Sequence, residues 1–121
     1  MRKLALFLLP LSSLIACRAP EAKSPTAEEK EFTIALAKMC DVDRQAGLEA
    51  SGDPLGLGPK RTAWITENVV HPDIIELRTL MSVKGAPEQA VMLRARVKDA
   101  CLQGCALADA LAKTGEGGLS P

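Results

Sequence analysis

Residues 26–46 read TAEEKEFTIALAKMCDVDRQA, and this stretch decides the fold. Its first four residues have the pattern of a capping box, in which the Thr26 hydroxyl accepts a hydrogen bond from the Glu29 amide and the Glu29 carboxylate reaches back to the Thr26 amide. Apolar residues then recur at helical spacing on one face, namely Phe32, Ala35, Leu36, Met39, Cys40 and Ala46. Gly47 supplies a stop. The stretch therefore predicts one amphipathic helix over 27–46.

The rest of the chain continues the helical pattern. Further helices are predicted at about 60–70, 72–83, 87–101 and 105–113. Pro72 suits the first turn of the second of these. The residues expected to face the core of the last three are Ile74, Leu77, Leu80, Met81, Ala90, Leu93, Val97, Ala100, Cys101, Leu107, Ala108, Leu111 and Ala112. Because no segment alternates with a period of two residues, we expect an all-α fold, a small orthogonal or irregular bundle of four to five helices.

Two glycine-rich segments are predicted to lie outside the helices. Residues 47–59 hold four glycines and two prolines and are expected to form a loop. The Gly56-Leu57-Gly58 piece lacks the Lys-Ser/Thr of a phosphate-binding loop and the strand before it. Residues 115–121 are expected to form a flexible tail, which leaves a helical domain over 26–114. The hydrophobic core of a domain of about 90 residues gives only marginal stability, so a disulfide would stabilise the fold further.

The N-terminal segment has the pattern of an export signal. Arg2 and Lys3 are followed by a mostly apolar run from Leu4 to Ala16. This run is shorter than the about 20 apolar residues that span a membrane, and it fits the hydrophobic region of a signal peptide. The run is followed by residues 18–25, a short polar segment with two prolines that is expected to act as a tether.

The run ends Leu14-Ile15-Ala16-Cys17, which resembles the lipobox of bacterial lipoproteins. The resemblance implies a signal peptide over 1–16, cleavage before Cys17, and palmitate-type acyl chains on Cys17 that bind the membrane. Two or more chains hold a protein firmly, whereas one does not. Residues 17–25 would then be the lipidated cysteine and its tether. Arg18 is not the Asp of an inner-membrane retention signal, so the expected location is the cell envelope, at the outer membrane and facing the periplasm.

Three cysteines remain if Cys17 is acylated: Cys40, Cys101 and Cys105. An exported location is oxidising, so one disulfide and one leftover thiol are expected. Cys40 lies on the buried face of the first helix. Its pairing with Cys105 is favoured because the last helix is too short to be stable alone, and pairing with Cys101 competes. A bond between Cys101 and Cys105 would tie only neighbouring turns.

Two short motifs of the mature domain also resemble a known pattern. Met39-Cys40, together with Cys105-Ala106-Leu107-Ala108-Asp109 near the end, is similar to a pattern in small exported helical proteins of unassigned activity. The resemblance carries no activity to this chain, but it supports Cys105 as the partner of Cys40.

The same cysteines also allow a competing hypothesis, a soft-metal or thiol-redox site. Its residues would be Cys40, Cys101, Cys105 and His71, a composition known from structural zinc sites. The usual Cys-x₂-Cys spacing of such sites is missing.

The composition argues against several functions. The chain has one His and no nucleophile motif, so we expect no enzyme and no cofactor. Asp41 and Asp43 point to different faces of the predicted helix and are expected to be solvated beside Arg44. Aromatic residues are 2% and the net charge is zero, which excludes the usual footprints of nucleic-acid binding.

A binding or assembly module of the envelope, with a protein partner, is therefore the expected function. Its possible contact patch is Lys60, Arg61 and Trp64, which follow the glycine-rich loop. Trp64 as a large filler of the core is the favoured alternative to that patch.

Overall fold

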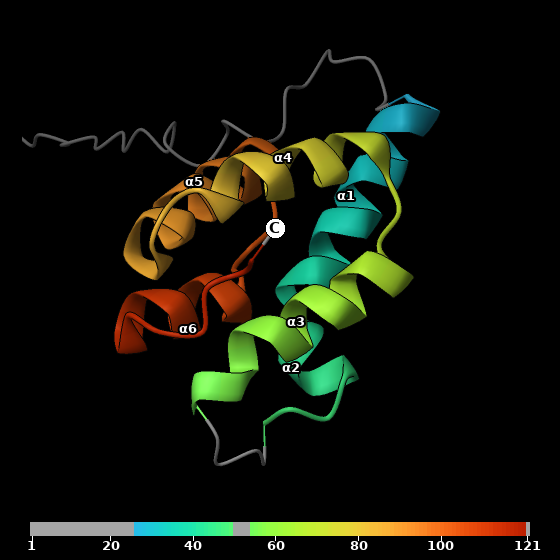
Figure 1. Ribbon diagram of the computed structural model, residues 1–121. Helices are drawn as coiled ribbons and strands as arrows, with labels where there is room; N and C mark the ends of the chain where they lie inside the picture. The colour runs from blue at the N-terminus through green and yellow to red at the C-terminus, as the bar shows by residue number, and fades with distance from the viewer. Residues whose placement is uncertain (1–25, 50–53, 121) are drawn as a thin grey trace, which may run out of the picture.

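The computed structural model describes residues 26–49 and 54–120, and all regular structure within them is helical (Figure 1). The helices are α1 (Ala27–Cys40), α2 (Val42–Gln45), α3 (Pro54–Asn68), α4 (Pro72–Ser82), α5 (Ala86–Asp99) and α6 (Ala106–Thr114). The prediction of an all-α bundle is confirmed. None of the helices in these ranges is long and apolar enough to cross a membrane. The predicted signal peptide, Cys17 and the tether lie outside the described residues.

The first helix begins as predicted and ends earlier. The Glu29 amide donates to Thr26 Oγ1 at 3.1 Å and the Thr26 amide donates to Glu29 Oε1 at 2.8 Å, so the capping box is formed. α1 then ends at Cys40, because Asp41 has φ −103° and ψ 18° and breaks the helical path. The chain resumes as α2, and the change of direction places Val42 fully in the core. The prediction of a single helix over 27–46 was therefore wrong at its end.

A disulfide joins Cys40 at the end of α1 to Cys105, the residue that precedes α6. The two Cα atoms are 4.8 Å apart, the residues are 65 apart in sequence, and both side chains are buried. The favoured pairing is thus confirmed. The expectation that Cys101 is a buried leftover thiol was wrong. α5 ends at Asp99, so Cys101 lies in an exposed turn with φ 60°, and it is not a free thiol.

α3 begins at Pro54, six residues before the predicted start, so part of the predicted 47–59 loop is helical. Pro54 suits a first helical turn because its missing N–H would have no partner there. Gly58 is buried against the C-terminal segment, and a Cβ at this position would collide with the carbonyl oxygen of Gly118. Tertiary packing therefore stabilises a helix over glycines whose intrinsic propensity disfavours it.

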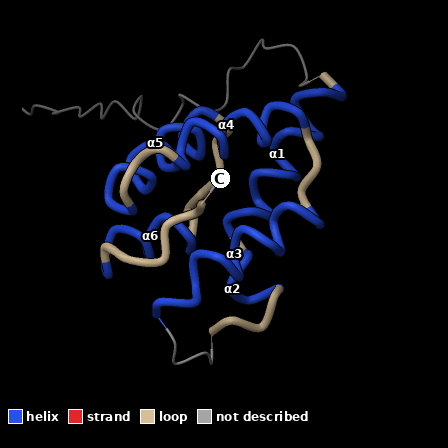
Figure 2. The backbone as a smooth tube through the Cα atoms, in the orientation of Figure 1, coloured by secondary structure: helices blue, strands red, loops and turns tan. Residues whose placement is uncertain are grey.

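Residues 115–120, which we name the strap, are packed on the body and are not the flexible tail that was expected. The strap returns from the end of α6 into the middle of the bundle (Figure 2). Leu119 is 3% exposed and belongs to the core. Its amide and carbonyl both bond to the Gln89 side chain of α5. The partners are 30 residues apart, so no local pattern of the sequence reveals them.

The core is one continuous cluster to which every described helix contributes. α5 and α6 pack together most extensively. The fully or nearly fully buried apolar residues are Leu36, Met39, Cys40, Val42, Ile65, Val69, Ile74, Leu77, Met81, Ala86, Ala90, Leu93, Val97, Cys105, Leu107, Ala108, Leu111 and Leu119. Trp64 is half-buried and packs against this cluster, as the core-filler interpretation expects.

Candidate functional site

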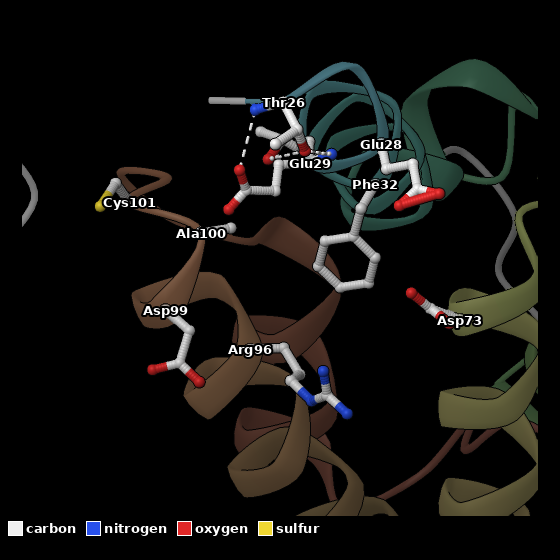
Figure 3. Close-up of a pocket in the computed structure, with 10 residues that line it drawn as sticks. Thr26, Glu28, Glu29, Phe32, Asp73, Arg96, Asp99, Ala100 and Cys101 are labelled. Atoms are coloured by element: carbon white, nitrogen blue, oxygen red, sulfur yellow. Dashed lines mark hydrogen bonds between the residues drawn. The ribbon is translucent and has the colours of Figure 1, made fainter. Parts of the chain in front are cut away.

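A groove of about 530 Å³ lies where the start of α1 meets the start of α4 and the end of α5. Its lining residues are Thr26, Glu28, Glu29, Phe32, Thr33, Asp73, Arg96, Asp99, Ala100 and Cys101. We name it the α1 groove, and Figure 3 shows it in close-up. Its lining includes Thr26, the first residue that the structure describes.

The Phe32 ring extends from α1 into the groove (Figure 3). It is half-buried and forms a T-shaped pair with the ring of His71, with 5.6 Å between the ring centroids. The capping box fixes where α1 begins and therefore which residue of its second turn faces the groove. The groove thus has an aromatic surface of defined position among polar side chains.

The charges of the α1 groove are mostly negative. Four carboxylates line it, and Arg96 is the one basic residue in its lining, with a guanidinium that reaches from α5 into the space (Figure 3). Glu28 and Asp73 lie in the first turns of α1 and α4, where the helix dipole stabilises an acidic group. Asp99 is the last residue of α5, where the dipole disfavours it. Glu29 also lies in the first turn of α1, as part of the capping box, so helix stability explains three of the four acids and not Asp99.

The groove has the chemistry of a binding surface for a basic ligand. Its carboxylates would attract a lysine or arginine, and the Phe32 ring would contact the methylene stem of that side chain. Within the described residues, no group of three or more His, Cys, Asp or Glu side chains is arranged to hold a metal ion.

The predicted contact patch of Lys60, Arg61 and Trp64 does not form a surface. Arg61 is only 3% exposed and turns inward. Its Nε and Nη2 donate to the two carboxylate oxygens of Asp43 at 2.7 and 2.6 Å. Asp43 is therefore not solvated beside Arg44 as expected. The residue that pairs with Arg44 is Asp41, and the Arg44 guanidinium holds the pKa of that carboxyl below its usual value.

The alternative set of Cys40, Cys101, Cys105 and His71 is not brought together. Cys40 and Cys105 are joined to each other, and Cys101 lies in the exposed turn after α5. His71 serves as the N-cap of α4, and its Nδ1 accepts from the Asp73 amide at 3.1 Å.

The α1 groove was not predicted from the sequence, because the ends of three separate helices form it. Acidic residues in a first turn, such as Glu28, look the same whether they stabilise a helix or bind a ligand. The one signal in the sequence was Asp99, an acidic residue at the end of a predicted helix where a basic one is favoured.

In comparisons with known proteins, the chain matches no protein-family model, no curated protein and no solved structure.

Proposed function

We propose that this chain is a lipid-anchored binding module of the bacterial cell envelope, with the α1 groove as its contact surface for a protein partner. The observation that carries the proposal is the Cys40–Cys105 disulfide, which lies in the core and ties α1 to α6. Disulfides of this structural kind persist in oxidising compartments and are rare in the bacterial cytosol. The bond therefore agrees with the export signal indicated by the first 16 residues.

The anchor places the groove close to the membrane. Thr26 follows Cys17 by nine positions, and an extended chain spans at most about 3.3–3.6 Å per residue. The groove mouth would thus lie within about 30 Å of the acylated cysteine. A partner that binds there would sit at or near the membrane surface.

The charge of the groove decides what kind of partner fits. Anionic lipid headgroups would be repelled by the carboxylates of Glu28, Asp73 and Asp99, which outnumber the single guanidinium of Arg96. A protein segment that carries lysine or arginine would be attracted to them and would contact the Phe32 ring. The fitting partner is therefore an envelope protein with an exposed basic segment.

The anchor is tested by the mass of the chain purified from bacterial membranes. We expect the chain to begin at Cys17 and to carry the mass of a diacylglyceride and one further acyl chain, and we expect Cys17→Ser to release it from the membrane. The sulfur of Cys17 can form a thioether or a disulfide but not both. A chain that begins at Met1, or one whose Cys17 is joined to another cysteine, would contradict the proposal.

The contact surface is tested with Asp99→Lys and the matched control Glu67→Lys, an exposed position of α3 outside the groove. Asp99→Lys should raise stability by about 0.3–1 kcal/mol, because it places a basic residue at the end of α5. It should nevertheless weaken capture of the partner by a photo-cross-linker at residue 28, whereas the control should not. Equal capture by both variants would exclude the groove as the contact surface.

A further inference from the structure

The strap is held through its backbone, in the way that a receptor holds a short peptide. Arg61 Nη1 donates to the Gly117 carbonyl at 2.9 Å. Gln89 Oε1 accepts from the Leu119 amide at 2.8 Å, and Gln89 Nε2 donates to the Leu119 carbonyl at 3.0 Å. The Ser120 amide donates to Thr62 Oγ1 at 3.0 Å. These contacts use the strap's backbone, and the Leu119 side chain is its one buried anchor.

The receptor side of this contact is fixed by the body itself. Gln89 is 1% exposed, and its Nε2 also donates to the carbonyls of Met81 at 2.9 Å and Lys84 at 3.0 Å, between α4 and α5. Arg61 is oriented by its two bonds to Asp43. Because both side chains have partners outside the strap, the groove is preorganised for its occupant. We name it the strap groove.

The strap groove selects small residues before the leucine. Gly117 has φ 75°, a conformation that side chains disfavour, and a Cβ there would collide with Arg61. A Cβ at Gly118 would lie 3.1 Å from Gln89 Oε1, which is tighter than ordinary contact. The groove therefore fits a Gly-Gly-Leu segment whose first glycine has a positive φ.

The strap is joined to α6 by an exposed turn. Gly115 has φ 69°, and no atom lies within 4 Å of the place its Cβ would occupy. Thr114 and Glu116 on either side are exposed. To lead the strap away from its own body, this turn would have to give up the contacts of Thr114 Oγ1 with the Glu116 amide, at 3.1 Å, and with the Glu116 carbonyl, at 3.3 Å. Both contacts are exposed, so water can replace them.

We propose that the strap groove also takes the strap of a second copy, so that two copies exchange residues 116–120. A second copy carries the Gly-Gly-Leu-Ser segment for which the groove is shaped. Within one chain the short connection gives the strap a millimolar effective concentration, which favours the closed form in dilute solution. Exchange would be favoured where copies are concentrated, and this advantage rests on the proposed anchor, which would confine the copies to one membrane.

The exchange is tested by mixing two variants that cannot close on themselves. Gly58→Ala fills the groove with a methyl group, at a helical position where alanine is favoured, and leaves the strap intact. Leu119→Asp removes the strap's anchor and leaves the groove intact. Both chains begin at Arg18 and carry Cys101→Ser, so neither the anchor nor a disulfide can pair them.

We expect each variant alone to sediment as a monomer and the mixture to form a one-to-one pair, at least about tenfold tighter than the self-pairing of the unaltered chain. Adding Leu119→Asp to the Gly58→Ala chain should abolish the pair. The control Val83→Asp, at a 77% exposed position, should not. If circular dichroism shows that both chains are folded and no pair forms, the proposal is overturned.

A synthetic peptide of residues 114–121 keeps the test decisive if Leu119→Asp is poorly folded alone. The peptide should bind this variant and restore its helical signal, and the same peptide with Asp at position 119 should not. Binding of the peptide without pairing of the two chains would rule out a second copy as the occupant. Failure of both would rule out the strap groove as a receptor. Because the chains lack residue 17, neither outcome depends on lipidation.

Discussion

Removal of the Cys40–Cys105 disulfide should bring this domain close to its limit of stability. The bond closes a segment with a sequence separation of 65 residues. The chain-entropy relation gives about 4 kcal/mol for a loop of this length. Small domains have total stabilities of about 5–15 kcal/mol, so the loss is a large fraction of what is available. At about 4–8 °C per kcal/mol for a domain of this size, Tm should fall by roughly 15–30 °C.

The comparison uses urea unfolding of the Cys40→Ala/Cys105→Ala variant and the unaltered pair, in chains that begin at Arg18 and carry Cys101→Ser. Alanine suits both positions because the two side chains are 6% and 5% exposed. A reductant should destabilise the chain with the pair and leave the variant unchanged. If the variant lies within about 1 kcal/mol of the oxidised chain, the loop-closure reasoning is refuted. The same holds if the reductant affects both chains equally.

Three further predictions concern single side chains. Gly58→Ala should lower stability by about 1–3 kcal/mol, because the methyl group collides with the Gly118 carbonyl, whereas Gly104→Ala, with open space around it, should be neutral in the same urea titration. Gln89→Ala should cost about 3 kcal/mol, because it leaves the buried amide and carbonyl of Leu119 without partners, and the exposed Gln103→Ala should stay within about 0.5 kcal/mol. Hydrogen bonds from Arg44, and to a smaller extent from Gln45, lower the pKa of Asp41 in the folded state. The ionised carboxyl therefore stabilises the fold above its ordinary pKa of 3.8, and this stabilisation is lost as the pH falls through the lower folded-state pKa. Asp41→Asn should therefore reduce the loss of stability below pH 3.8, measured as the urea midpoint against pH. If the urea midpoint falls as steeply below pH 3.8 in the variant as in the unaltered chain, Asp41 does not stabilise the fold in this way.

The parts of the fold that could be predicted are those encoded locally. The capping box at Thr26 and Glu29, the proline that opens α4 and the apolar spacing of α5 each depend on residues within a few positions of one another. The Cys40–Cys105 pair is a long-range feature, yet it could be favoured because only three candidate sulfurs remained and one short helix needed support.

The missed features depend on distant partners. Arg61 looked like a surface residue because the carboxylate of Asp43 and the carbonyl of Gly117 lie 18 and 56 residues away. The strap looked flexible because its glycines favour disorder in isolation, and only contacts with Arg61, Gln89 and Gly58 reveal why glycine is needed there. The α1 groove was not predicted, since helix ends far apart in the chain meet only in the folded state.

The order in which the cysteines are synthesised does not favour the native Cys40–Cys105 disulfide, and docking of α6 selects it. Cys40 is synthesised long before either later cysteine, and Cys101 emerges ahead of Cys105, so order of appearance alone would favour the wrong bond. The apolar face of α6 buries Leu107, Ala108 and Leu111, and in doing so it delivers Cys105 to the end of α1. Oxidation to the native bond must therefore wait for docking of the last helix. An oxidant that acts earlier would trap a mispaired chain, which only an isomerase or a thiol buffer could rescue.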